Sequence, residues 1–292
     1  MRSLPRPTDK NAKPFEAGEV FETCVSMVRN GALRAKLRGV RAQVETASTD
    51  YIEKAASAQL FEIAINNSVG AVSGAEMVQV YTNRMVPKSS TGRPIYDRIM
   101  ASPVNQRCPL CGLGIVNTLD HYLPKTHFPV FSVEPNNLIP ACEWCQGEKR
   151  ECYASTIGGQ ILHPYFDDFD CDVWLVADVV VGSPAAFRFY SLPPEHWSAV
   201  NRARAATHLQ QLKLPYLFAC NAGGRLSEIR YRLAGLFDKG GVDAVRSHLH
   251  EELASFEAEH KNSWLAAMYR AAVSSDWFCN GGVQEKIDRS SR

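Results

Sequence analysis

The sequence predicts an α+β protein in which a small metal-bound module lies between a helical region and a region of hairpin plus helices. Three observations support this fold class. Two Cys-x-x-Cys pairs enclose residues 108–145. Apolar residues recur at helical spacing before these pairs. After them, a run rich in β-branched and aromatic residues precedes further helical patterns. We therefore expect a helical region at 1–100, the metal module at 101–166, and a β-hairpin and helices at 167–292.

The N-terminal region is expected to begin with a loose arm over residues 1–14, followed by helices to about residue 67. Within it, residues 29–41 carry a dense set of basic side chains: Arg29, Arg34, Lys36, Arg38 and Arg41. Guanidinium groups bind phosphates bidentately, so this segment can grip nucleic acid. The alternative is a solvated helix face balanced by the nearby acids Glu45, Asp50 and Glu53.

A Gly/Ser stretch at 68–74 then interrupts the helices, and the pattern predicts further helices over 77–85 and 94–102. On the C-terminal side, residues 172–181 and 186–192 are expected to pair as a hairpin through a Gly-Ser-Pro connection. Helical patterns follow from residue 195, with separate helices over 215–237 and 241–260.

The chain contains nine cysteines, and four of them form the two pairs Cys108/Cys111 and Cys142/Cys145. Each Cys-x-x-Cys turn presents two thiolates to one point, and two such turns supply the four ligands of a tetrahedral zinc ion. The sequence therefore predicts a structural Zn²⁺ that fastens the ends of the module together. The other cysteines are scattered and the N-terminus has no apolar signal core, which favours a cytoplasmic protein with one metal clamp over a secreted disulfide scaffold.

Between the cysteine pairs, residues 116–124 (VNTLDHYLP) predict a short strand ending in the polar pair Asp120-His121. Residues 136–142 (NNLIPAC) predict a second strand, and residues 145–155 begin a helix. His121 is able to take a proton near neutral pH, and Asp120 offers a hard oxygen ligand for a divalent cation. These are the groups that phosphodiester hydrolysis requires, since water must be activated and phosphate charge neutralised.

This arrangement resembles the HNH nucleases, over about a seventh to a fifth of the chain. The resemblance implies a ββα-metal module in which His121 is the general base and Asn137 orients it. It also implies that Asp120 and Gln146 ligate a catalytic Mg²⁺ or Mn²⁺. The sequence departs from the usual C-N-x-x-K pattern at Gln146. Asn136 precedes Asn137, so a shift of one residue is an alternative; we favour Asn137 because it directly precedes the apolar strand.

Other polar residues are weaker candidates. Lys125, His127 and Lys149 can contact phosphate or can simply be exposed, and Trp144 is expected to pack rather than stack on a base. A second cluster, His163, Asp167, Asp168 and Asp170, is either a metal or substrate site or a loop held by local hydrogen bonds. His208, His248, His250 and His260 are expected as surface or core histidines. Residues 276–278 either dock a partner or fold back on the protein.

Two functions remain open from the sequence. The first is a metal-dependent HNH endonuclease that cuts DNA, expected to be double-stranded. The second is a zinc-stapled module that binds nucleic acid or protein without turnover, because Gln146 prevents the catalytic metal from binding. The net charge of +1 gives no global field for attracting DNA, so a protein partner is expected to supply it. The layout resembles Septu-type and retron-associated antiphage defence nucleases, which implies an ATPase partner. No apolar run reaches membrane-spanning length, so no membrane association is expected.

Overall fold

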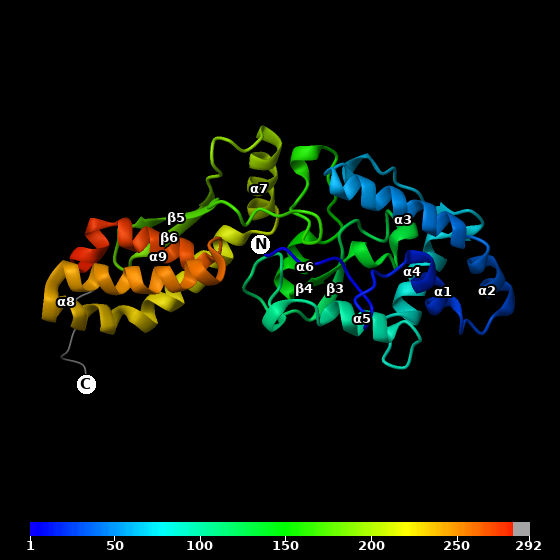
Figure 1. Cartoon of the computed structure of the whole chain (residues 1–292), viewed down its shortest axis with the longest axis horizontal. Coiled ribbons are helices and arrows are strands. Elements are labelled where there is room, and N and C mark those ends of the chain that lie inside the picture. The colour runs from blue at the N-terminus through cyan, green and yellow to red at the C-terminus, as the bar shows by residue number, and fades with distance from the viewer. Residues whose placement is uncertain (283–292) are drawn as a thin grey trace. The chain divides into compact units, whose positions relative to one another are not determined.

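The computed structural model describes residues 1–282, and the chain forms two compact units. The first unit is Met1–Asp168, and the second begins at Phe169 (Figure 1). The first unit contains both the N-terminal helices and the region of the cysteine pairs. Helices and small two-stranded sheets make up both units, which confirms the mixed α and β content expected from the sequence.

Helices form most of the first unit before the cysteine pairs: α1 (Ala17–Val25), α2 (Gly31–Arg38), α3 (Arg41–Ala56), α4 (Gly74–Arg84) and α5 (Arg93–Met100). Their starts follow local capping chemistry. The Asn30 side chain accepts a hydrogen bond from the first turn of α2, and Ser73 forms a reciprocal capping box with Glu76 at the start of α4. The apolar side of α1, including Phe21 and Cys24, is fully buried, and α1 packs against α3 and α4.

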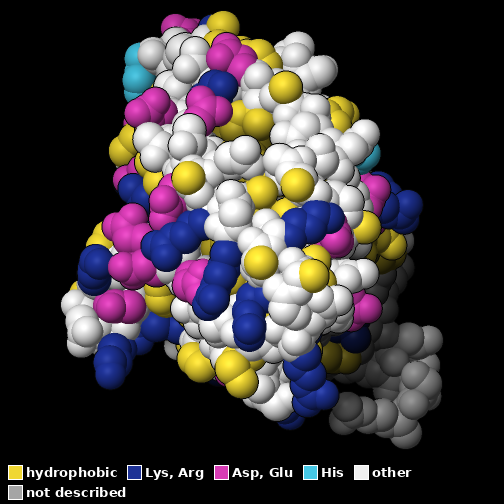
Figure 2. All heavy atoms as spheres, turned by 90° about the vertical axis from the view of Figure 1, so that its right-hand side faces the viewer, with side chains coloured by type: hydrophobic (Ala, Val, Ile, Leu, Met, Phe, Trp, Pro, Cys, Tyr) yellow, Lys and Arg dark blue, Asp and Glu magenta, His cyan; other side chains and the backbone are white. Residues whose placement is uncertain are grey.

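The basic segment at residues 29–41 lies on and around α2. Three of its side chains form ion pairs with acids on other turns or helices: Lys36 with Glu76, Arg38 with Glu22, and Arg41 with Glu45. Figure 2 shows Lys and Arg side chains interspersed with Asp and Glu on the end of the unit where the N-terminal helices lie. The segment is therefore a partly neutralised helix surface, although its balancing acids differ in part from those that the sequence suggested.

Short strands complete the first unit. β1 (Ser68–Val69) and β2 (Val72–Ser73) form a tight hairpin before α4. β3 (Thr118–His121) pairs antiparallel with β4 (Leu138–Ala141), with His121 opposite Leu138. α6 (Glu143–Lys149) follows β4 directly, and α5 packs against both strands. Every residue of β4 is buried, so this strand lies in the core of the unit.

The second unit contains the predicted hairpin, which the structure confirms. β5 (Leu175–Val180) pairs antiparallel with β6 (Ala186–Ser191) in continuous register. The helices are α7 (Ala199–Gln211), α8 (Leu214–His260) and α9 (Trp264–Ser274). α8 is broken at Gly240 and Gly241, where Gly241 has φ 62° and ψ −152°, a conformation open essentially to glycine alone. The two halves of α8 fold side by side beneath α9 (Figure 1), joined across by Arg225 and Glu252.

The segment at 276–278 folds back on the second unit. Phe278 is fully buried with its ring 5.8 Å from that of Phe187, and Asp276 pairs with Arg246 at 2.7 Å. Across the described residues, none of the helices combines the length and the apolar character needed to cross a membrane.

Asn262, between α8 and α9, connects the helices of the second unit to the start of β5. Its Oδ1 accepts from the backbone N–H groups of Trp174 (2.9 Å) and Leu175 (3.3 Å). Its Nδ2 donates to the carbonyls of Phe169 (3.3 Å) and Asp172 (2.8 Å). With 1% of its surface exposed, Asn262 satisfies backbone groups that water cannot reach.

Replacing Asn262 with alanine should therefore destabilise the second unit by about 2 to 4 kcal/mol, because several buried backbone groups lose their partners together. Urea unfolding and hydrogen exchange of residues 169–180 measure this effect. Gln210→Ala, at an exposed position of α7, is the control and should change stability by less than about 0.5 kcal/mol. Equal stability of the two variants would contradict the role given to Asn262.

Candidate functional site

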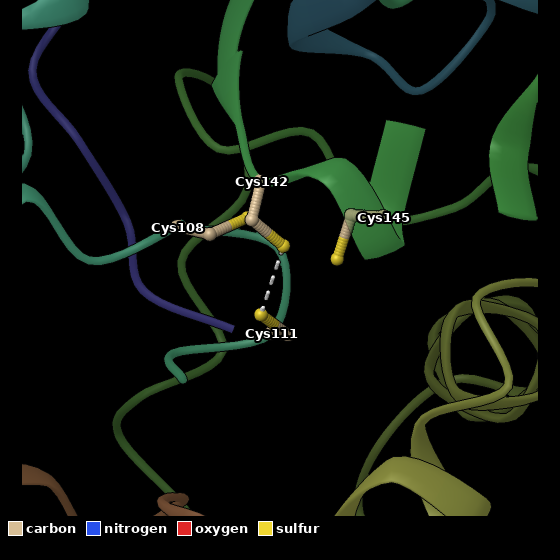
Figure 3. A group of neighbouring side chains, drawn as sticks. All are labelled: Cys108, Cys111, Cys142 and Cys145. Carbon is tan, nitrogen blue, oxygen red and sulfur yellow. Dashed lines mark hydrogen bonds between the residues drawn. The ribbon is translucent and has the colours of Figure 1, made fainter. Parts of the chain in front are cut away.

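The four paired cysteines converge on one point in the first unit. Cys108 and Cys111 lie in the loop before β3, Cys142 immediately precedes α6, and Cys145 lies in its first turn. All four are buried, their sulfur atoms lie within 4.8 Å of one another, and the Cys111 and Cys142 sulfurs are 3.8 Å apart (Figure 3). Tetrahedral zinc with Zn–S bonds of about 2.3 Å separates its sulfurs by roughly 3.8 Å. The cluster thus fits a structural zinc ion, as the sequence predicted.

Two glycines shape the first cysteine turn. The N–H of Gly112, which has φ 69°, donates to the Cys108 carbonyl at 2.7 Å. The N–H of Gly114 donates to the Cys111 sulfur at 3.3 Å, and a Cβ at position 114 would lie 2.6 Å from the Cys142 sulfur. Hydrogen bonds from the neighbouring thiols, Cys108 first, lower the pKa of Cys111. The spacing of the cysteines alone does not point to these glycines, but the order C-x-x-C-G-x-G marks them in the sequence.

Removing one thiolate should destroy the clamp. Structural zinc contributes on the order of 10 kcal/mol to the free energy of folding. Cys142→Ser should therefore lose its zinc, and its first unit should no longer unfold in a cooperative transition. Elemental analysis should find one zinc per chain in the wild type, and thermal melting should show the loss of the transition. Cys220→Ser, at an exposed position of the second unit, should keep both properties. Folded wild-type protein without zinc would rule out the assignment.

His121 ends β3 and is 3% exposed. Its Nε2 lies 2.9 Å from the Ser132 carbonyl oxygen. Because a carbonyl oxygen only accepts, Nε2 carries the hydrogen, and Nδ1 is the basic nitrogen of the neutral ring. Burial lowers the pKa of His121 to about 3, and the positive charge of Lys125 acts in the same direction. The imidazole is therefore neutral at neutral pH, and burial makes its Nδ1 a weaker base than the solvated imidazole that the sequence suggested. The Tyr81 ring packs edge-on against it at 4.5 Å.

Asn137 immediately precedes β4 and is fully buried. Its Oδ1 accepts from the Leu123 N–H at 2.7 Å, and its Nδ2 donates to the carbonyls of Leu123 (3.0 Å) and Phe131 (3.3 Å). Asn137 thus joins the two ends of the loop between β3 and β4. Asn136 has different partners: Arg6 donates to its side chain, which donates in turn to Glu134. Of the two asparagines, Asn137 is the one whose side chain holds the loop around His121.

Asp120, beside His121 on β3, is paired with Lys149 from the last turn of α6. The Lys149 ammonium lies 3.3 Å from Asp120 Oδ2 and donates to the His121 carbonyl at 2.6 Å. Lys149 is 2% exposed, so it is an interior partner of Asp120. Burial raises the pKa of Asp120, and the charge of Lys149 opposes that shift. Gln146 lies three residues before Lys149, on the same side of α6, and is exposed. The structure thus brings Asp120, His121 and Lys149 together, and Gln146 lies exposed one turn before Lys149 on α6.

Lys125 is the remaining cation near His121. It is half-buried with its ammonium 5.4 Å from the centre of the Tyr81 ring, and burial lowers its pKa. His127 is partly exposed, near Glu151 at 3.9 Å and against the Tyr153 ring. Trp144 is partly buried on α6. Lys125 is therefore the lysine of this region with access to both solvent and the surroundings of His121.

The candidate cluster at residues 163–170 is divided between the two units. In the first unit, the backbone N–H of His163 donates to the Asp167 carboxylate at 2.6 Å, while Asp168 is exposed. In the second, Asp170 pairs with His260 at 3.0 Å. The four cysteines are the group of potential metal ligands that converges within residues 1–282. Local hydrogen bonds therefore account for the first part of this segment. Of the other C-terminal histidines, His208 is fully buried, His248 is partly buried and His250 is exposed.

Comparison with known proteins supplies one relative. The chain is 32% identical over 229 residues to Protein ea31 of Escherichia phage lambda, covering 73% of this chain and 76% of that protein. The chain belongs to the Ea31 family. No protein-family model and no solved structure matches it. Membership of the Ea31 family identifies no reaction.

Proposed function

We propose that this Ea31 family member is a metal-dependent endonuclease that hydrolyses phosphodiester bonds of DNA. The observation that carries the proposal is the state of His121. Its Nε2–H is tied to the Ser132 carbonyl, its Nδ1 is the basic nitrogen, and a buried carboxylate, Asp120, lies next to it in sequence. The order β3, β4 and α6, with Asn137 bracing the connecting loop, matches what the resemblance to HNH nucleases implies.

In this proposal His121 Nδ1 removes a proton from the attacking water. The water oxygen forms a bond to phosphorus, and the bond to the leaving sugar oxygen breaks. Asp120 and Gln146 would hold a Mg²⁺ or Mn²⁺ ion, which supplies charge neutralisation at the phosphate and the leaving oxygen when bound. Lys125 adds a positive charge for the phosphate, and Asn137 holds the loop so that the imidazole keeps its orientation.

A second candidate function is a zinc-stapled unit that binds nucleic acid or protein without turnover. The pairing of Asp120 favours it, because Lys149 already supplies a positive charge to that carboxylate at 3.3 Å. Gln146 favours it too, since its side chain is one methylene longer than Asn. Catalytic geometry tolerates little error, and a displacement near 1 Å costs roughly a hundredfold in rate.

The setting in which the nuclease acts is a further part of the proposal. The net charge of +1 and the ion pairs of the basic segment leave little field to attract a duplex. A protein partner, such as the ATPase subunit of an antiphage defence system, would then supply the grip on DNA. This part rests on charge and on the resemblance in layout.

His121→Ala should reduce Mg²⁺- or Mn²⁺-dependent plasmid cleavage to background, because the variant lacks the proton acceptor. Zinc content should stay at the wild-type value, since the imidazole lies outside the cysteine cluster. His196→Ala, a mostly exposed histidine of the second unit, is the control and should cleave like wild type. Full activity of His121→Ala would contradict the role of His121 as the general base. Loss of zinc would show that His121 supports the zinc site instead.

Gln146→Asn should raise divalent-metal-dependent cleavage by at least about tenfold, since the shorter amide restores the usual ligand length. Zinc content should not change. Gln146→Ala, which removes the amide oxygen, should be slower than the wild type in the same assay. If the asparagine variant is no faster than the wild type, Gln146 is either a competent ligand or not part of the metal site.

A further inference from the structure

A buried hydrogen-bond chain reaches Asn137 from outside the strands and helix of the candidate nuclease site. It begins at His163, in the segment that follows α6, and passes through Tyr51 of α3. The Tyr51 hydroxyl lies 3.0 Å from His163 Nε2 and 3.2 Å from Asn137 Oδ1. Tyr51 and Asn137 are fully buried and His163 is 1% exposed, so their polar groups take hydrogen-bond partners inside the unit.

The direction of each hydrogen bond follows from the backbone. The N–H of Tyr165 lies 3.2 Å from His163 Nδ1 and must donate to it, so the neutral ring carries its hydrogen on Nε2 and donates to Tyr51. The Leu123 N–H must donate to Asn137 Oδ1, which fixes the amide orientation. Tyr51 donates to that same oxygen at 3.2 Å, which is closer than its other acceptor, the Asn136 carbonyl at 3.5 Å. Burial raises the pKa of Tyr51 well above its ordinary value, so the hydroxyl keeps its proton.

The chain ends at two backbone carbonyls in the loop that follows His121. Asn137 Nδ2 donates to the carbonyls of Leu123, two residues after His121, and Phe131. Phe131 directly precedes Ser132, whose carbonyl accepts the His121 Nε2–H. A rotation of the Asn137 amide would therefore disturb the carbonyl that selects the His121 tautomer.

The rings around the chain restrict its movement. His163 stacks on Tyr122 at 4.3 Å and meets the edge of Phe166 at 4.9 Å, while Tyr51 packs edge-on against Phe131 at 5.0 Å. A phenylalanine at position 51 would fill the same space, so packing alone does not require the hydroxyl.

We infer that Tyr51 and His163 are positioning residues that fix the Asn137 amide and, through the loop it holds, the tautomer and orientation of His121. The effect on cleavage rests on the proposed nuclease function. The effect on the state of His121 does not.

The test compares Tyr51→Phe with Tyr122→Phe in the full zinc-loaded chain. Tyr122 is the matched control, because its buried hydroxyl donates to the Ile161 carbonyl at 2.7 Å and not to Asn137. Nitrogen-15 NMR of the histidine rings reports the tautomer and the exchange rate of the His121 Nε2–H. In Tyr51→Phe, this hydrogen should exchange at least about tenfold faster or the ring should show a mixture of tautomers. In Tyr122→Phe, the signal should match the wild type.

Cleavage supplies the second readout. Tyr51→Phe should lower kcat about tenfold or more with KM within about twofold, because the substrate contacts are untouched while the base is misaligned. An unchanged His121 signal in folded Tyr51→Phe would overturn the inference whatever the activity. A wild type that cleaves no DNA would refute the proposed function, while the NMR comparison would still decide this inference.

A second pair of variants guards against misfolding of Tyr51→Phe. His163→Gln keeps an amide donor that can reach the Tyr51 hydroxyl, and His163→Leu removes it at similar volume. The glutamine variant should retain the wild-type His121 signal, and the leucine variant should show the change expected for Tyr51→Phe. Identical His121 signals in the two variants would refute the role of the donor.

Discussion

The closure of residues 108–111 onto the start of α6 is the constraint on which the central part of the first unit depends. β3 and β4 have four residues each and α6 has seven, lengths at which a lone hairpin or helix is marginal in water. The four sulfurs within 4.8 Å join the loop before β3 to the beginning of α6, so the strands between them are held at both ends. The position of α6 then decides where Lys149 and Gln146 lie relative to Asp120. A zinc ion at the cysteines would thus organise a second site in which it takes no chemical part.

Local patterns were sufficient to predict most elements and the cysteine cluster. Spacing alone identified Cys108, Cys111, Cys142 and Cys145, and β-branched and aromatic residues around a Gly-Ser-Pro connection identified the hairpin of β5 and β6. The long-range contacts were not predictable in this way. Tyr51 and His163 are separated by 112 residues, and neither position carries a local signal that names the other. The burial of Lys149 was missed for the same reason, because an isolated lysine in a short helix is usually exposed.

Buried polar groups fix the arrangement of side chains in the candidate site, and their burial costs folding free energy. Asp120, His121, Asn137 and Lys149 all lie in the core of the first unit, where an unpaired polar group is expensive. Each has partners that fix its role: a carbonyl sets the His121 tautomer, and a backbone N–H sets the Asn137 amide. The helices α3 and α4 contribute through Tyr51 and Tyr81, whose hydroxyl donates to the Leu119 carbonyl of β3 at 3.0 Å. The N-terminal helices therefore take part in building the site.

The ion pair between Asp120 and Lys149 has different consequences for the two candidate functions. A divalent ion on Asp120 would share that carboxylate with an ammonium, and like charges about 4 Å apart repel by roughly 4 kcal/mol per unit pair near a protein surface. One carboxylate cannot balance both cations. The phosphate of bound DNA brings the missing negative charge, so in the proposed enzyme Asp120 would take up its ion most readily together with substrate. In a protein that only binds, the Asp120–Lys149 pair is already neutral and needs no ion. The same ion pair thus fits a substrate-coupled catalyst and a metal-free binding module.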